Sequence, residues 1–424
     1  MATIGLDFGS SNSTLSWYNP VSGKVEAVFF EGDATVKVPS GIVAQNNKLY
    51  EGFEATGIIE DTYGLSEQQR FELLSNYIPS LKRIMDPRQV EFLGDKKFTH
   101  RQLLEIYVQY MVERASEHCG RNYKIDSVVF TYPVDFSKEK IDLMSNALEN
   151  VGLKVESCLP EPEAAAYGHG AIHEVNERDG ILIFDFGGGT VDVAYAIKKG
   201  KHFKLAVPPK GNSHCGGRDI DNVIYEYFRK IINKDKGIDI SENGVNDPGI
   251  MLACRRLKER FSGKEDEYAT GTLLINKGKV EMYKLSLTRQ RFNELISPVV
   301  DNAVHVAKEV ISSVRERNYP LNRIVMIGGS SNLVLLEEQL NLLSDATIVR
   351  GGEKDIAVAM GALVYEMNKE EQRNETSETL KDNTDTKKNT QKVANEKYDE
   401  NEKKEGGVIV VPPDKNDGIL DIFS

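Results

Sequence analysis

A turn with three successive glycines follows an apolar strand in residues 181–192. The strand leads to Asp185, and Asp192 stands two residues beyond Thr190. The glycines of the turn are Gly187, Gly188 and Gly189. Glycine backbone can direct its N–H groups at a ligand, and a concave row of N–H groups binds anions. Because the flanking carboxylates could hold a cation that bridges to phosphate, the segment predicts a phosphate clamp. The alternative is a glycine-rich hairpin with solvated aspartates.

A second copy of this plan occupies residues 3–14. Asp7 ends another apolar strand, and small residues follow it: Gly9, Ser10, Ser11 and Asn12. A third apolar strand, residues 323–327, leads into a second kind of ligand turn, formed by Gly328, Gly329 and Ser330. Two equivalent aspartate turns in one chain predict a duplicated α/β unit, in which each half offers one turn to a shared cleft.

The composition excludes several classes of protein. With 28% charged and 40% hydrophobic residues among 424, the chain is typical of a soluble globular protein. No apolar run approaches the roughly 18 residues of a spanning helix, and no basic leader precedes the first strand, so we expect no membrane and a cytoplasmic location. A net charge of −12 argues against nucleic acid as a partner. The four widely spaced cysteines predict neither a zinc site nor disulfides.

Alternating strands and helices must position these turns. Thr99 is typical of a helix N-cap, and the helix that follows is predicted to end at Gly120. Strands are predicted at residues 25–30 and 127–131, and helices at residues 137–150, 219–231 and 250–261. This rhythm indicates a mostly parallel or mixed sheet covered by helices.

Two further polar residues are ambiguous when taken alone. Lys82 is most simply interpreted as a solvated surface lysine. Glu161 lies between Pro160 and Pro162, which restrict the backbone on either side and hold its carboxylate on a stiff loop. In isolation such a glutamate is usually part of a surface turn.

The ordered set of motifs resembles the 70-kDa heat-shock chaperones of the DnaK type, within the actin-like, hexokinase-like nucleotide-binding superfamily. The three turns are similar to the family's two phosphate motifs and its adenosine motif. Further similar segments occur in the same order, at residues 81–84, 131–133, 161–168, 211–219 and 357–362. The resemblance spans roughly residues 1–368. The His-x-Gly-Gly-x-Asp segment at residues 214–219 distinguishes this family from actins and sugar kinases.

The resemblance implies a duplicated α/β fold of the ribonuclease-H-like, actin-like ATPase type, with two lobes around a nucleotide cleft. Residues 1–172 are expected to form lobe I, with a small subdomain at 37–99. Residues 173–351 are expected to form lobe II, with a small subdomain at 215–288. Residues 352–368 are expected to form a closing helix that returns to lobe I. Residues 369–424 are nearly devoid of apolar residues up to 405 and are predicted to be a disordered charged tail with short apolar patches at its end.

The resemblance also implies an ATPase that uses ATP/ADP, Mg²⁺ and K⁺. Asp7 and Asp185 are expected to hold the cation through water. The residues implied in placing the attacking water are Lys82, Glu161, Thr190 and Asp192. The remaining cofactor-binding residues implied are Gly9, Ser10, Ser11, Asn12, Gly187, Gly188, Gly189, Gly216, Gly217, Lys258, Ser262, Gly328, Gly329, Ser330 and Asp355.

Three positions depart from the family's pattern. Arg255 stands where the family usually has glutamate, and Asn332 stands where an adenine-stacking arginine is often found. The preference for adenine therefore stays open. Ile141 stands where the family often has an arginine that relays signals between domains.

The function expected from these observations is a stand-alone heat-shock-70-like ATPase domain that changes conformation to control a protein partner. It is expected to lack a peptide-binding domain, because only about 55 residues follow the closing helix. The partner is expected to contact the tail or the lobe surfaces, although the terminal apolar patches could equally be an inert terminus. The alternatives are a nucleotide-gated interaction module with little hydrolysis and an actin-like filament-forming ATPase. Sugar kinase activity is least expected, since no acceptor-binding feature is seen.

Overall fold

The structure is a computed structural model, and it describes residues 2–30, 34–61, 65–120, 123–242, 245–246, 248–263, 268–276, 280–350 and 356–371. The described residues up to 368 form one compact unit. Residues 369–371 continue the last helix, which covers 357–371. The rest of the predicted tail and Asp355 lie outside the described residues.

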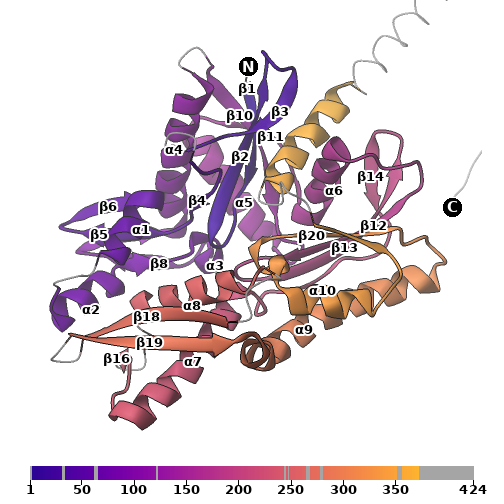
Figure 1. Cartoon of the computed structure of the whole chain (residues 1–424). Helices are drawn as coiled ribbons and strands as arrows, with labels where there is room; N and C mark the ends of the chain where they lie inside the picture. Colours follow the sequence, from indigo (N-terminus) through magenta and orange to yellow (C-terminus); the bar gives the residue numbers. More distant parts are fainter. Residues whose placement is uncertain are drawn as a thin grey trace, which may run out of the picture. The chain divides into compact units, whose positions relative to one another are not determined.

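The first half of the chain is built on a sheet with both antiparallel and parallel strands (Figure 1). Its strand order is β11-β10-β1-β2-β3, with β4 paired to β2. β1 runs parallel to β10 and antiparallel to β2. The bounds are β1 (Ala2–Asp7), β2 (Asn12–Asn19), β3 (Lys24–Ala27), β4 (Val38–Pro39), β10 (Ile125–Tyr132) and β11 (Lys154–Pro160). β3 ends at Ala27, earlier than predicted, and within the described residues Phe30 forms an isolated bridge to Thr35.

The second half repeats this sheet. Its strand order is β14-β13-β12-β20-β21, with β15 paired to β13, and the strand directions match the first sheet position by position. Asp7 pairs with Thr14 across β1 and β2, and Asp185 pairs with Asp192 across β12 and β13. The bounds are β12 (Gly180–Phe186), β13 (Val191–Lys199), β14 (His202–Leu205), β15 (Lys210–Asn212), β20 (Arg323–Ile327) and β21 (Thr347–Arg350). The predicted duplicated α/β fold is thereby confirmed.

Helices cover these sheets. Thr99 caps α4 as predicted, because its side chain accepts from Gln102 N while Gln102 bonds back to Thr99 N. Ser137 is the N-cap of α5, so this helix begins within one residue of its predicted start. The helices packed on the two main sheets are α4 (His100–Cys119), α5 (Lys138–Asn150), α6 (Glu161–Ile172), α9 (Arg289–Glu316) and α10 (Val334–Asn341).

Each half also carries a smaller set of elements, inserted between its strands. In the first half these are β5 (Ile42–Gln45), β6 (Lys48–Glu51), α1 (Gly52–Glu60), α2 (Glu67–Ser75), β7 (Tyr77–Ile78), α3 (Leu81–Ile84), β8 (Val90–Leu93) and β9 (Lys96–Thr99). In the second half they are α7 (Gly217–Lys236), β16 (Ser241–Glu242), β17 (Val245–Asn246), α8 (Pro248–Arg260), β18 (Tyr268–Asn276) and β19 (Val280–Thr288). Taking the boundaries proposed from the sequence, we call residues 2–172 lobe I and residues 173–350 lobe II.

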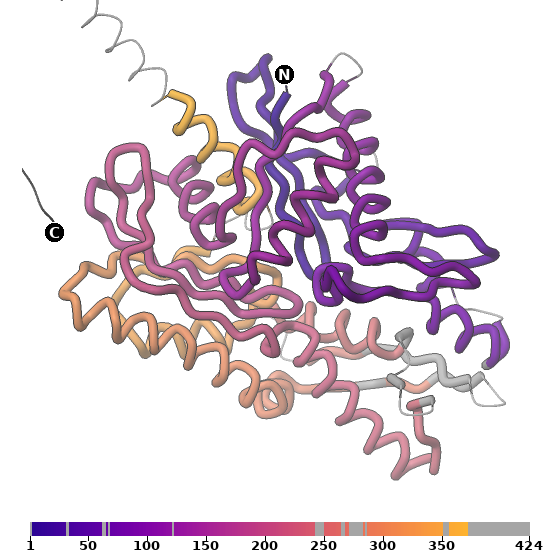
Figure 2. The backbone as a smooth tube through the Cα atoms, turned by 180° about the vertical axis from the view of Figure 1, so that it is seen from behind, coloured from indigo at the N-terminus to yellow at the C-terminus, as the bar shows by residue number. Residues whose placement is uncertain are grey.

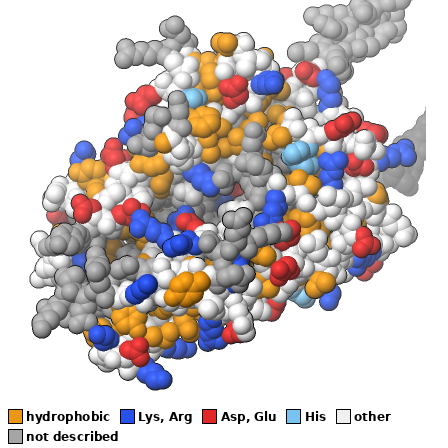
Figure 3. Space-filling view, in the orientation of Figure 1, with side chains coloured by type: hydrophobic (Ala, Val, Ile, Leu, Met, Phe, Trp, Pro, Cys, Tyr) orange, Lys and Arg blue, Asp and Glu red, His pale blue; other side chains and the backbone are white. Residues whose placement is uncertain are grey.

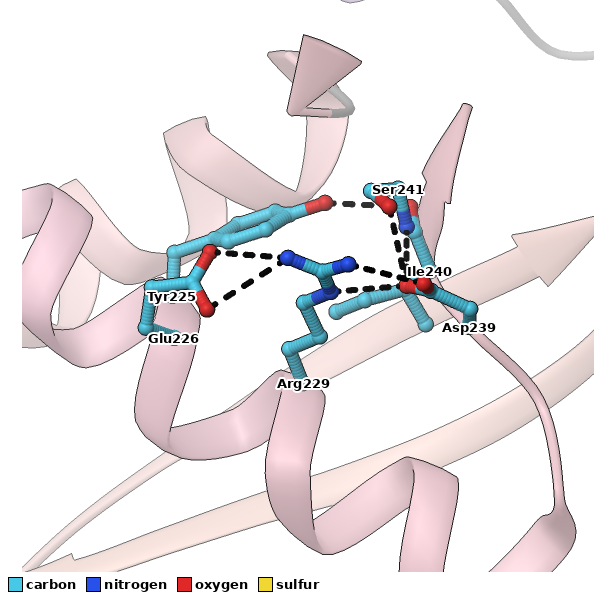
Figure 4. A network of polar contacts seen from close by, with 6 residues as sticks. All are labelled: Tyr225, Glu226, Arg229, Asp239, Ile240 and Ser241. Carbon is cyan, nitrogen blue, oxygen red and sulfur yellow. Dashed lines mark hydrogen bonds and ion pairs between the residues drawn. The ribbon is translucent and has the colours of Figure 1, made fainter. Parts of the chain in front are cut away.

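A polar network fixes the chain after α7 (Figure 4). Arg229 binds both carboxylate oxygens of Asp239, at 2.7 and 2.8 Å. Asp239 also accepts from the N–H and hydroxyl of Ser241, at 3.0 and 2.9 Å. Tyr225 donates to Ile240 O at 3.0 Å. These side-chain bonds hold residues 239–241 against α7, so the position of this segment does not depend on sheet pairing alone.

The two lobes are joined by α6 and the helix at residues 357–368, which lie side by side in both backbone views (Figures 1 and 2). Their backbones touch where both helices have glycine: a Cβ on Gly361 would overlap Ala164 O, and one on Gly168 would overlap Ala357 O. A buried cluster of small and apolar residues from both lobes, including Ala165, Ile183 and Ala362, surrounds this crossing. The two helices are therefore in close backbone contact, and residues of both lobes pack around this contact.

Candidate functional site

Four acidic residues and one lysine converge where the lobes meet. Asp7 ends β1 and Asp185 lies at the equivalent place in β12. Glu161 opens α6 and forms an ion pair with Lys82 of α3, and each side chain is only 7% exposed. Breaking such a buried pair leaves an uncompensated charge, so both partners are held in place.

The pKa values of the three aspartates in this group are raised. Burial, followed by the nearby Glu161 charge, raises the pKa of Asp7 to about 7, although Lys82 opposes the shift. Burial, followed by Glu161, likewise raises the pKa of Asp192 to about 7. The pKa of Asp185 is raised well above its ordinary value by burial and by its three acidic neighbours. A bound cation would relieve this concentration of negative charge.

The donor set fits a cation held through water. Among the described residues, no group of three or more His, Cys, Asp or Glu side chains is arranged to bind a metal directly. Asp192 Oδ2 is buried and has no hydrogen-bond partner in the described part of the chain. Thr131 donates to Asp7 at 3.4 Å, which leaves that carboxylate further acceptor capacity.

The glycine turn of lobe II has its carbonyl groups occupied by the protein. Gly187 O accepts from Gly217 N at 3.0 Å and from the Ser330 hydroxyl at 2.8 Å. Gly188 O accepts from Arg218 N at 2.9 Å, and Gly189 O accepts from Arg83 at 2.8 Å. Within the described residues, the N–H groups of Gly188, Gly189 and Thr190 have no acceptor. The carbonyls are satisfied and the N–H groups are free, which is the arrangement of an anion-binding turn.

The turn of lobe I faces this one. A Cβ added to Gly188 would overlap the Ser11 hydroxyl, so the two turns come into direct contact. Ser11 O accepts from Ser40 N at 3.0 Å, which anchors the lobe I turn from behind. Gly9 is required by its own turn, because a Cβ there would overlap Asn12 O. Ser11 thus lies against the glycine turn, and Gly9, Ser10 and Asn12 belong to the same turn of lobe I.

The third turn joins the glycine turn from the end of β20. Gly328 has φ +79°, and a Cβ there would lie 2.5 Å from Asp185 Oδ1. Gly329 differs, because no described atom lies within 4 Å of an added Cβ. Asn332 donates to Gly329 O at 3.2 Å and is therefore turned back onto its own loop. Gly328 is therefore packed against β12, whereas the space beside Gly329 is free of described atoms.

Lys258 of α8 has protein partners. Its Nζ donates to Gly217 O at 2.9 Å and lies 2.8 Å from Asp221 Oδ1. Asp221 was not predicted, because nothing in the sequence links it to Lys258, which is 37 positions away. Ser262 lies just beyond α8, and its N–H donates to Glu259 O at 3.2 Å. Arg255 pairs with Glu259 at 3.0 Å, so its charge is compensated within the helix.

The structure thus brings together most of the residues singled out from the sequence. Asp7, Asp185, Asp192, Glu161 and Lys82 share one buried electrostatic cluster. Gly216 packs against the glycine turn, because a Cβ there would lie 2.5 Å from Gly189 C. Arg83 and Arg218 also contact this turn, and the sequence reasoning gave them no role. Asp355 lies outside the described residues.

A model of the Hsp70 protein family matches residues 68–384, more than half of the sequence. The chain belongs to the Hsp70 family. The match agrees with the resemblance seen in the motifs and with the two-lobe, actin-like fold. Members of the Hsp70 family bind ATP, which makes this chain an ATP-binding, chaperone-related protein. Within the described residues, none of the helices is both long and apolar enough to span a membrane.

Proposed function

We propose that this Hsp70 protein hydrolyses ATP with Mg²⁺ in the cleft between its lobes. The observation that carries the proposal is the buried Lys82–Glu161 pair among three aspartates, set beside a glycine turn with free N–H groups. Phosphoryl transfer needs mainly positioning and charge neutralisation, and this site offers donors, carboxylates and one lysine for both.

Each group has a distinct role in the proposed reaction. Mg²⁺, when bound, offsets the phosphate charge, and Asp7 and Asp185 hold its water shell. The N–H groups of Gly188, Gly189 and Thr190 hold the phosphate oxygens. Lys82 places a positive charge against the terminal phosphate and fixes Glu161, which orients the attacking water. Asp192 keeps a free oxygen and has a raised pKa of about 7, so it can take up the proton that the water loses.

The nucleoside is proposed to lie between Gly329, Gly217 and the end of α8. Lys258 holds Gly217 O and Asp221 and thereby shapes this region. The remaining Nζ donor of Lys258 and the Ser262 hydroxyl are available to the sugar.

On the basis of the family resemblance, Asp355 is proposed as a further nucleotide-binding residue and K⁺ as a second cation. We further propose that the nucleotide shifts the two lobes about the helix crossing and so controls a protein partner.

Asp185→Asn tests the cation assignment. Phosphate release from ATP is expected to fall by at least about 100-fold and to lose its dependence on Mg²⁺, because a neutral amide attracts the hydrated cation far less. The control is Asp142→Asn, an exposed aspartate on α5 remote from this cluster. Hydrolysis is measured with Mg²⁺ or EDTA present and in Na⁺ or K⁺ buffer. An unchanged Mg²⁺ dependence in Asp185→Asn would exclude the assignment.

Gly329→Ala tests the nucleoside position. No described atom opposes a Cβ there, so the variant is expected to keep its melting temperature. ADP affinity is expected to fall about tenfold, because the methyl group enters the space proposed for the nucleoside. The comparison variant is Gly328→Ala, which is strained by its positive φ and meets Asp185, and should lose stability. Unchanged ADP affinity in a folded Gly329→Ala protein would place the nucleoside elsewhere.

A further inference from the structure

A buried network of hydroxyl groups lies behind the turn of lobe I. The hydroxyl of Ser13, on β2, is 3.0 Å from the hydroxyl of Ser40, which follows β4. Tyr107 of α4 lies beside both serines: burial raises the pKa of its hydroxyl, and hydrogen bonds with Ser13 and Ser40 oppose the rise. The Tyr107 hydroxyl also donates to Val38 O at 3.3 Å. All three hydroxyl-bearing side chains are fully buried, so each must find its partner within the protein.

The backbone of Ser40 connects two parts of the proposed site. Its N–H donates to Ser11 O at 3.0 Å, in the lobe I turn that contacts Gly188. Its carbonyl accepts from Leu81 N at 3.3 Å, at the first residue of α3, and Lys82 is the next residue. Ser40 is therefore bonded on one side to the lobe I turn and on the other side to the helix that carries Lys82.

The helix that carries Lys82 is too short to hold its own position. α3 has four residues, and its N-cap residue, Ser80, makes no side-chain cap bond. A helix of this length depends on its tertiary contacts. In the space-filling view, Lys and Arg side chains gather in the middle of the face on which Figure 1 shows α3 and α8 (Figure 3). Lys82 differs from these surface cations, because its side chain is buried and its place is set by the residues packed around it.

We propose that the Ser13–Ser40–Tyr107 network positions Lys82 relative to the turn of lobe I. The three hydroxyls fix Ser40, and its backbone then fixes both the turn and the start of α3. Ser40 is therefore a positioning residue that acts through Lys82. Hydrolysis depends steeply on such placement, since a displacement of about 1 Å can cost about 100-fold in rate. The inference rests on the proposed function, and it assigns a role to a buried network that neither the motifs nor the family match singles out.

Ser40→Ala tests the inference, because it removes the hydroxyl and leaves both backbone bonds. The rate of ATP hydrolysis in a single turnover is expected to fall about tenfold, while ATP affinity changes less than about twofold. Ser13→Ala is expected to have a similar effect. Because the two hydroxyls share one hydrogen bond, the double variant is expected to lose well under the product of the single effects. The measurements are single-turnover phosphate release and equilibrium ATP binding, on the full chain with Mg²⁺.

The same substitution in a Lys82→Ala background shows whether Ser40 acts through the lysine. A positioning role predicts that Ser40→Ala slows hydrolysis less than about twofold once the Lys82 side chain is absent. A general loosening of the core would slow hydrolysis equally in both backgrounds. A tenfold effect of Ser40→Ala that persists without Lys82 would therefore overturn the inference.

Ser127→Ala is the matched control. Ser127 is also buried, and its hydroxyl lies 2.8 Å from the Thr3 hydroxyl, but this pair lies near the end of β1 that is remote from Asp7. Ser40→Ala and Ser127→Ala are expected to lower the melting temperature by similar amounts, because each removes one buried hydrogen bond, and only Ser40→Ala is expected to lower turnover.

Two results separate this inference from the proposed function. Equal turnover in Ser40→Ala and Ser127→Ala would overturn the positioning role alone, and Ser13→Ala gives the same comparison if Ser40→Ala does not fold. A wild-type protein that does not hydrolyse ATP with Mg²⁺ would overturn the proposed function as well.

Discussion

Lys82→Ala is expected to lower the rate of ATP hydrolysis by at least about 100-fold while the protein still binds ATP. The positive charge of Lys82 lowers the pKa of each of the three aspartates in the cluster, and its ion pair fixes Glu161. Glu161→Gln is expected to have a similar effect on turnover, because an amide neither holds Lys82 as strongly nor accepts from water as well. Single-turnover hydrolysis and equilibrium ATP binding separate the two quantities.

Loss of folding must be distinguished from loss of chemistry. Removing one partner of a buried pair costs about 3–5 kcal/mol of stability, whereas removing both charges costs much less. The double variant Lys82→Met/Glu161→Gln is therefore expected to melt near the wild-type temperature and to stay inactive. Lys140→Ala is the matched lysine control, since Lys140 and Lys82 both lie over the Phe136 ring, at 5.2 and 5.9 Å. Turnover that falls only in proportion to ATP affinity would show that the pair has a structural role alone.

Gly361→Ala is expected to lower the free energy of unfolding by about 3 kcal/mol, which for a unit of this size corresponds to a melting temperature roughly 4 °C lower. The added Cβ would overlap Ala164 O and lie 2.6 Å from Gly168 N, and backbone atoms of a packed helix cannot move aside cheaply. Because the crossing joins both lobes, nucleotide affinity should fall with stability. The measurement is denaturant unfolding of the full chain with and without ADP.

The control for this variant is Gly57→Ala on α1. Gly57 is also a helical glycine, but it is exposed and no described atom lies within 4 Å of an added Cβ. Alanine is therefore expected to raise stability by about 0.5–1 kcal/mol through helix propensity. If Gly361→Ala and Gly57→Ala had equal effects, the close contact of the two helices would be contradicted.

The parts of the fold that depend on neighbouring residues could be predicted from the sequence. Thr99 and Gln102 form a capping box because the interaction needs only three residues of spacing. The apolar run before Asp185 indicates a strand buried on both faces, and β12 is such a strand. The duplication was visible because the strand and turn around Asp7 and Asp185 repeat locally, and the two sheets share one strand order.

Interactions between distant residues could not be predicted in this way. Arg83 and Arg218 have the pattern of ordinary surface arginines, and only the approach of the lobes gives them carbonyl partners. Asp221 gains its partner Lys258 because α7 and α8 pack together. Lys82 and Glu161 are separated by 79 positions. Taken alone, each was interpreted as a surface residue, and only the family resemblance assigned both to one site. Propensity and spacing describe single elements, whereas these pairs are made by tertiary packing.

The central claim is that the paired turns and the carboxylate cluster form one Mg²⁺-dependent nucleotide site. Calorimetric titration of the full chain with ADP, in Mg²⁺ and again in EDTA, tests it most directly. The account predicts one site per chain, with affinity at least about tenfold higher in Mg²⁺ and no such gain in Asp185→Asn. Saturable ADP binding that is equally strong in EDTA, or no saturable binding in Mg²⁺, would contradict it.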